Sequence, residues 1–239
     1  MALREKLVPG EFYHLYNRGT EKRKIFLSKR DHERFLALLF LSNSKDPSRL
    51  DNLTRSEQGS TLLTRALKIE RGETLIDIAA YCLMPNHFHL LVREKEEGGI
   101  SRFMQKLSTG YTMYFNKKYE RSGTLLQGKF KSSHAGEDRY LRYLISYIHL
   151  NPVKLIEPKW KEIGIRDKKK ASDFLEEYNY SSFLDFCKQE RAEAAIITPG
   201  ALPDYFDSPA DFKQSLTEWL IEQNEQGSTL LKGFGNINR

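Results

Sequence analysis

The stretch Thr74-Leu75-Ile76-Asp77-Ile78-Ala79-Ala80-Tyr81-Cys82-Leu83, continued by Met84-Pro85-Asn86-His87-Phe88-His89-Leu90-Leu91-Val92-Arg93, decides the fold of this 239-residue chain. Two runs rich in aliphatic residues stand on either side of Pro85-Asn86, a pair typical of a break in regular structure. The pattern predicts two strands, over residues 74–83 and 86–93.

The flanking sequence supplies the remaining elements. Before the two strands, the pattern predicts a strand over 12–16, a break at 17–19, and a helix from an N-cap at Ser28 to about residue 41. After them it predicts a helix over 101–119, a hairpin or extended arm over 124–133, and a helix opened by Glu137 or Asp138. Asn151-Pro152 closes that last helix, because proline cannot continue it. The order β-α-β-β-α-(β)-α predicts an α+β fold, a split β-α-β arrangement with an antiparallel sheet.

Charge divides the chain into two parts. Residues 1–158 hold 27 Lys and Arg against 18 Asp and Glu, a balance of +9, and residues 159–239 hold 11 against 14, a balance of −3. We expect a main domain over 1–158 with a polar insertion at 42–69, then an acidic, mainly helical extension over 159–239. Lys168-Lys169-Lys170 is predicted to be a linker. The excess of positive charge in residues 1–158 predicts a polyanionic partner, although a solvated surface explains this charge equally well.

Composition excludes several classes of protein. The chain is 39% hydrophobic and 29% charged, with no apolar run long enough for a membrane span and no signal-peptide pattern at its start. The two cysteines, Cys82 and Cys187, form neither a disulfide framework nor a thiolate zinc motif. We expect no membrane partner and a cytoplasmic, nucleoid-associated location.

Two histidines separated by one residue are the first candidate for chemistry. Side chains at i and i+2 of a strand share a face, so His87 and His89 present their imidazoles together while Phe88 points to the other layer. Neutral imidazoles bind divalent metal ions. The spacing alone favours two structural polar histidines over a metal site.

Tyr147 and Asn151 are the second candidate. They lie four residues apart on a predicted helix and therefore share a face. An amide oxygen suits a hard cation, and a tyrosine beside that cation can act as a nucleophile. Taken singly, Tyr147 is better explained as a core residue and Asn151 as a helix stop before proline.

Basic residues interleaved with aromatic ones suggest contact with single-stranded nucleic acid. One cluster surrounds Tyr114, Phe115, Tyr119 and Phe130, and another follows the first strand. The alternative is that both clusters form a solvated rim. The residues assigned to DNA binding are Arg18, Lys22, Arg23, Lys117, Lys118, Arg121, Gln127, Lys129 and Lys131.

Four motifs occur here in one order: Asn17-Arg18-Gly19, Met84 to Val92 as quoted above, Gln127-Gly128-Lys129-Phe130-Lys131, and Tyr147-Ile148-His149-Leu150-Asn151-Pro152-Val153-Lys154. Together they resemble the HUH single-tyrosine transposases, in particular the REP-associated tyrosine transposase branch. The resemblance covers about residues 10–158. It implies a ferredoxin-like α+β sandwich, the HUH endonuclease fold.

The resemblance also implies roles for individual residues. His87 and His89 would bind Mg²⁺ or Mn²⁺, Asn151 would complete the metal site, and Tyr147 would attack DNA to form a 5′-phosphotyrosine. The partner would be single-stranded or hairpin DNA at repeats or element ends, with monomer and homodimer both open. The implied activity is that of a metal-dependent single-stranded DNA endonuclease and strand transferase, a transposase. Two rivals remain: a domesticated hairpin-DNA-binding protein with little or no cleavage, and a hydrolase that uses water with the same metal.

Overall fold

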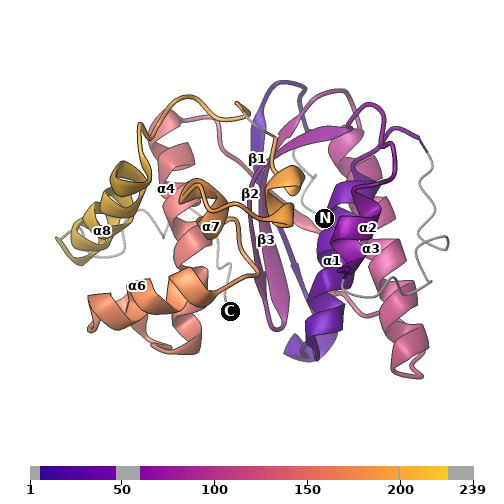
Figure 1. Cartoon of the computed structure of the whole chain (residues 1–239), viewed down its shortest axis with the longest axis horizontal. Helices are drawn as coiled ribbons and strands as arrows, with labels where there is room; N and C mark the ends of the chain where they lie inside the picture. Colours follow the sequence, from indigo (N-terminus) through magenta and orange to yellow (C-terminus); the bar gives the residue numbers. More distant parts are fainter. Residues whose placement is uncertain (1–5, 47–59, 199, 226–239) are drawn as a thin grey trace.

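Four antiparallel strands form the centre of the protein (Figure 1). In this computed structural model, the description covers residues 6–46, 60–198 and 200–225. The strands are β1 (Phe12–Arg18), β2 (Ile76–Met84), β3 (His87–Glu94) and β4 (Lys131–His134), arranged in the order β2-β3-β1-β4. β2 and β3 form the hairpin predicted from the sequence, with Met84 opposite His87. This order, with helical segments between β1 and β2 and a helix between β3 and β4, is the ferredoxin-like split β-α-β topology. The predicted fold class is therefore confirmed.

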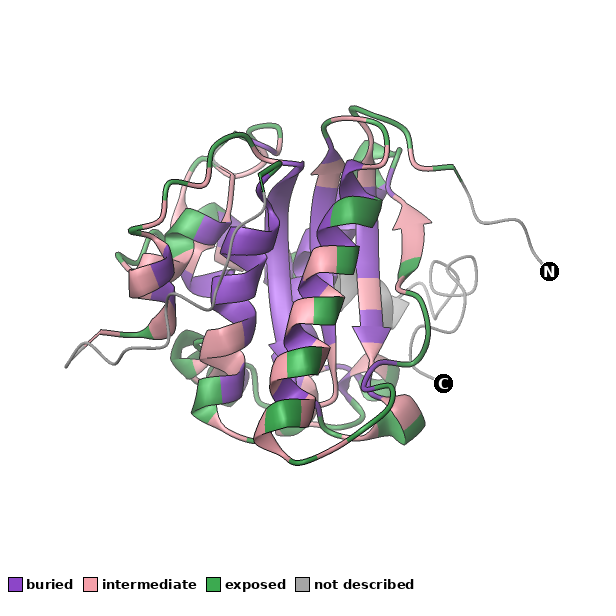
Figure 2. Cartoon of the chain, turned by 90° about the vertical axis from the view of Figure 1, so that its right-hand side faces the viewer, coloured by how far each residue is buried: buried purple, intermediate pink, exposed green. Residues whose placement is uncertain are grey.

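Helices α1 (Lys29–Ser42), α2 (Leu62–Ala66) and α3 (Gly99–Lys118) cover one face of the sheet. Alternation along the strands places Leu15 of β1 and Phe88 of β3 on this face, where they join the larger of two apolar cores. Figure 2 shows the sheet buried almost throughout behind these helices, which carry exposed residues on their outer sides.

Helix α4 (Asp138–Leu150) covers the opposite face, and the second core forms between it and the sheet. Leu91 of β3 and Cys82 of β2 point into this core. The same alternation therefore sends His87 and His89 towards α4. Asn151-Pro152 ends the α-helix as predicted, and the chain continues as a 3₁₀ helix, η3 (Asn151–Leu155).

The helix boundaries have local causes. Ser28 and Asp31 form a capping box at the start of α1, as the N-cap prediction at Ser28 required. The Asp31 carboxylate is fully buried and also accepts hydrogen bonds from Tyr114, Lys118 and Tyr119 of the α3 end. The start of α1 is thereby tied to the end of α3.

The chain beyond residue 158 is mainly helical where described, as expected. It contains α5 (Trp160–Ile163), α6 (Lys168–Glu177), α7 (Phe183–Phe186), a 3₁₀ helix η4 (Ala192–Ile196) and α8 (Pro209–Glu225). The linker predicted at Lys168–Lys170 is wrong, because these residues form the first turn of α6, capped by the Asp167 side chain. Of the predicted insertion, 47–59 lies outside the described residues, and α2 occupies part of the remainder. No described helix combines the length and apolar character that a membrane crossing requires.

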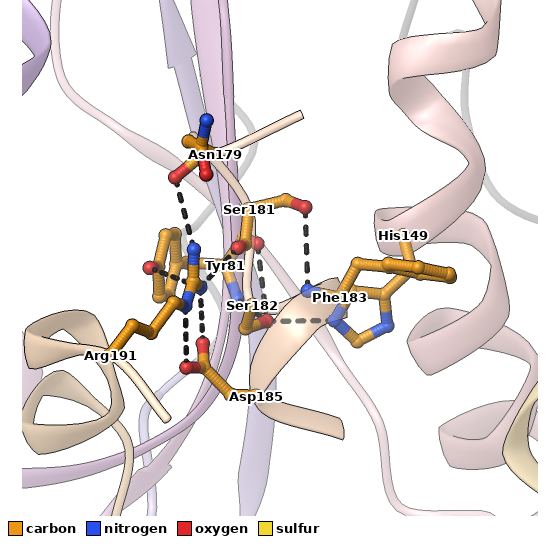
Figure 3. A network of polar contacts seen from close by, with 8 residues as sticks. All are labelled: Tyr81, His149, Asn179, Ser181, Ser182, Phe183, Asp185 and Arg191. Atoms are coloured by element: carbon orange, nitrogen blue, oxygen red, sulfur yellow. Dashed lines mark hydrogen bonds and ion pairs between the residues drawn. The ribbon is translucent and has the colours of Figure 1, made fainter. Parts of the chain in front are cut away.

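This extension covers the outer edge of β2. Ser181 forms an antiparallel bridge to Cys82, with backbone bonds from Leu83 to Tyr180 and from Ser182 to Tyr81. A buried polar network fixes the segment (Figure 3), in which Arg191 binds Asp185, the Ser181 carbonyl and the Tyr81 hydroxyl. β2 is consequently buried along its whole length although it is the last strand of the sheet.

Candidate functional site

His87 and His89 form the centre of the candidate site, on the α4 side of β3. His89 is 1% exposed and His87 is partly exposed, with their ring centroids 4.9 Å apart. The strand alternation predicted from the sequence thus places both imidazoles on one face.

Each imidazole is oriented through its Nδ1 atom. His87 Nδ1 lies 2.6 Å from Asn86 Oδ1, and His89 Nδ1 lies 2.9 Å from His14 Nε2. The amide oxygen can only accept, so Nδ1 of His87 carries the proton. The Nε2 atoms of His87 and His89 are buried and have no hydrogen-bond partner among the described residues. Two such nitrogens, with the opposite ring atom held by a neighbour, are the arrangement expected of metal-binding histidines.

Burial and nearby charge keep these rings neutral. Burial lowers the pKa of His87 to about 3, and the positive charges of Lys161, Lys154 and Arg18 add to the shift. The pKa of His89 is also well below its usual value, again mainly because of burial. A neutral imidazole offers a lone pair, so the site is in the protonation state that binds a cation.

Tyr147 and Asn151 lie where α4 approaches the histidines. The Tyr147 ring stands edge-on to His89 at 5.6 Å and to His14 at 5.9 Å, and its side chain is 3% exposed. Asn151 is 1% exposed and donates from Nδ2 to the Tyr147 carbonyl at 2.8 Å. The structure therefore brings together His87, His89 and Tyr147, and fixes Asn151 beside the tyrosine.

Lys161 enters this group from α5. Its Nζ lies 3.2 Å from Asn151 Oδ1 and 4.1 Å from the centroid of the Tyr147 ring. Burial lowers the pKa of Lys161 to about 7, helped by the charge of Lys154. No third His, Cys, Asp or Glu joins the two histidines in a metal-binding group within the described ranges. The part of Asn151 as a third ligand stays a prediction.

A pocket of about 630 Å³ opens in front of His87 and His89. Of the predicted DNA-binding residues, Arg18, Lys22, Gln127 and Lys131 line it. The Arg18 side chain bonds Gln127, and the Arg18 carbonyl accepts from the Gln127 amide. These contacts bring the 124–130 arm against the end of β1, so that two separate motifs share one wall.

Gly19 is required where β1 leaves that wall. A Cβ on Gly19 would overlap the backbone carbonyl oxygen of Arg23, which turns back over it. The next residues, Glu21 and Lys22, have positive φ angles of 56° and 60°. Such backbone is uncommon for non-glycine residues and concentrates at functional loops.

The other predicted DNA-binding residues lie outside the pocket lining. Lys117, Lys118 and Arg121 are at the end of α3, where Lys118 binds Asp31 and Arg121 binds the Asn116 side chain. Arg23 pairs with Glu21 at 3.3 Å, and Lys129 is exposed in the 124–130 arm. Their part in DNA binding stays a prediction.

Two residues at the site were missed by sequence reasoning. His14 lies between the core residues Tyr13 and Leu15 on β1. Strand periodicity therefore places it on the same side of the sheet as His87 and His89, and this could have been predicted from the sequence. Lys161 had no such signal, because it follows η3 in a short helix whose direction depends on tertiary packing.

The region of residues 58–151 matches the model of a known protein family, described as transposase IS200 like. The match includes His87, His89, Tyr147 and Asn151 but not Asn17-Arg18-Gly19. It confirms the resemblance to single-tyrosine transposases over this segment.

Solved structures show weaker similarity. One, described as the REP-associated tyrosine transposase bound to a REP hairpin, is 12% identical, covers 87% of this chain and 99% of its own, and has a TM-score of 0.48. Another, a bacterial tRNA(His) guanylyltransferase-like protein in complex with ATP, is 10% identical, with 75% and 73% coverage and a TM-score of 0.37. No curated protein sequence matches the chain. The assignment of the fold therefore rests on the strand order.

Proposed function

We propose, on the premise that residues 58–151 form an IS200-like transposase segment, that this chain is a metal-dependent single-stranded DNA endonuclease and strand transferase. The observation that carries the proposal is the pair of buried Nε2 atoms of His87 and His89, which have no hydrogen-bond partner in the described part of the chain and lie at the wall of a basic pocket. A protein that only bound DNA would gain nothing from leaving two buried nitrogens unsatisfied, because each carries a desolvation cost.

His87 and His89 would hold Mg²⁺ or Mn²⁺ through Nε2, with Asn151 as the candidate third ligand. Once bound, the ion would polarise the scissile phosphate and neutralise the charge that develops on it. Asn86 and His14 would keep the two imidazole rings in the orientation that points Nε2 towards the ion.

Tyr147 would be the nucleophile. Its phenol oxygen loses its proton and forms a bond to phosphorus, the bond from phosphorus to the 3′ oxygen breaks, and that oxygen takes up a proton to leave as a 3′-hydroxyl. One proton thus passes in effect from the phenol to the leaving group. The product is a 5′-phosphotyrosine, in which one phosphodiester replaces another. A 3′-hydroxyl can therefore reverse the reaction and join strands without an energy source.

The side chain of Tyr147 must move for this reaction. It is 3% exposed and is not among the residues that line the pocket. Attack on a phosphate held in the pocket requires the phenol to move towards the pocket.

The pocket suits an unpaired strand. Arg18, Lys22, Lys24, Lys131 and Lys154 supply positive charge for phosphates. Tyr16 also lines the pocket and offers an aromatic face on which a base can stack.

The test is incubation of the protein with Mn²⁺ and with hairpin oligonucleotides labelled at the 5′ or 3′ end, followed by denaturing gels. We expect label on the protein band, its loss in Tyr147→Phe, and loss of cleavage in His87→Ala. Cleavage without label on the protein would instead indicate a hydrolase that uses water. Tight hairpin binding without cleavage would indicate a domesticated DNA-binding protein.

A further inference from the structure

We infer that Lys161 is a positioning residue of the proposed metal site, and that its amine competes with a divalent cation for the amide oxygen of Asn151. The inference rests on the proposed function. It concerns a residue ten positions beyond the segment that matches the transposase family.

The first step is the geometry of Asn151. Its Nδ2 donates to the Tyr147 carbonyl at 2.8 Å, which fixes the amide plane and determines where Oδ1 points. Lys161 Nζ lies 3.2 Å from that oxygen. The oxygen that could serve as a third metal ligand therefore already accepts a bond from the Lys161 amine.

Charge repulsion opposes the presence of both groups. When the Lys161 amine is protonated, it and a divalent cation bound to the same amide oxygen would repel one another strongly, particularly where protein replaces water. The Lys161 charge also reaches the histidines, since it contributes to the lowered pKa of His14, His87 and His89. Binding of the ion at Asn151 thus requires the amine to leave.

The Lys161 amine also contacts Tyr147, the proposed nucleophile. Lys161 lies over the Tyr147 ring at 4.1 Å, within cation–π range, and over Trp160 at 5.5 Å. The same amine that occupies Asn151 therefore stabilises the buried position of Tyr147. Its departure on metal binding would remove this contact from the tyrosine ring, so that loading of the ion would make movement of the nucleophile easier.

The experiment measures Mn²⁺ affinity by isothermal titration calorimetry on the full-length protein, without DNA. The variants are Lys161→Met, Asn151→Ala and the double variant, because methionine keeps the length of the lysine stem but removes its charge. We expect Lys161→Met to tighten Mn²⁺ binding about tenfold, within the range by which neighbours of metal ligands alter affinity. The gain should vanish when Asn151 is already alanine.

The control variant is Lys154→Met. Lys154 lines the pocket and acts electrostatically on His87, but no hydrogen bond joins it to Asn151 in the structure's described part. A gain in Lys154→Met equal to that in Lys161→Met, or a gain in Lys161→Met that persists in the Asn151→Ala background, would show general charge repulsion and overturn the competition.

The remaining outcomes separate this inference from the proposed function. Binding that is lost in His87→Ala but unchanged or weakened in Lys161→Met would overturn the competition and leave the metal site standing. Absence of Mn²⁺ binding in the wild type and in every variant would overturn both. Thermal unfolding of each variant shows that the fold is intact.

Discussion

Lys117 and Lys118 are adjacent lysines at the end of α3, both assigned to DNA binding from the sequence, and the structure predicts very different consequences of replacing them. Lys118 Nζ lies 2.6 Å from Asp31 Oδ1 and 2.7 Å from the Ser28 hydroxyl. Its side chain is 27% exposed and that of Asp31 is 0% exposed. Lys117 is exposed to solvent. We predict that Lys118→Met destabilises the protein and that Lys117→Met does not.

The size of the stability loss depends on the hydrogen bonds that Asp31 keeps in the variant. Removing one partner of a buried ion pair costs about 3–5 kcal/mol. In Lys118→Met, Asp31 still accepts hydrogen bonds from two tyrosine hydroxyls and from the amides of Leu27 and Ser28. We therefore expect a loss of about 2–3 kcal/mol in the free energy of unfolding. For a chain of this size the loss lowers Tm by about 5–10 °C.

The pH dependence provides a second check. Burial by itself would raise the pKa of Asp31, but hydrogen bonds from Lys118, Tyr119 and the Leu27 amide outweigh it and lower the pKa from 3.8 to about 2. The carboxylate therefore contributes stability above pH 3.8, and this contribution is lost as the pH falls towards 2. The difference in the free energy of unfolding between wild type and Lys118→Met should shrink as the pH falls over the same interval.

Urea unfolding at several pH values measures both effects, with Lys117→Met as the matched control. Neutral-pH stabilities of the two variants that agree within about 0.5 kcal/mol, the range of ordinary surface substitutions, would refute the reasoning. If wild type and Lys118→Met still differ by the same free energy of unfolding at pH 2, the role of Asp31 is refuted.

Three further predictions concern the site and the extension. His14→Phe should weaken Mn²⁺ binding about 10- to 100-fold, measured by calorimetry, because His89 Nδ1 loses its partner; unchanged affinity would remove His14 from the site. Lys131→Ala should reduce the slope of log K against log salt for single-stranded DNA by about 0.7, whereas an unchanged slope would place Lys131 outside the DNA path. Arg191→Met should cost about 3–5 kcal/mol because it leaves the Asp185 carboxylate, whose side chain is 6% exposed, without its cation. Hydrogen exchange at the Tyr81 amide should accelerate in that variant, and retained protection would contradict the role of the network.

The parts of the site that follow local periodicity were predictable. Alternation along β3 places His87 and His89 on one face, and helical spacing places Tyr147 and Asn151 together, so neighbouring residues suffice for both. The helix stop at Asn151-Pro152 and the cap at Ser28 have equally local causes.

The contacts that depend on tertiary structure were not predictable. His14 meets His89 across 75 residues of sequence through strand pairing. Lys161 reaches Asn151 only because η3 and α5 fold back onto α4. The contrast between Lys117 and Lys118 depends on which of the two faces Asp31 of another helix, and composition cannot distinguish them.

Residues 180–182 pair with the outer edge of β2 and affect how the protein can be purified. Tyr81 and Leu83 direct their outward backbone groups to Ser182 and Tyr180, so this edge offers no template for a strand from another molecule. A fragment ended at residue 158 would expose a long, apolar edge of the kind that promotes aggregation. We expect such a fragment to accumulate as insoluble β-rich material.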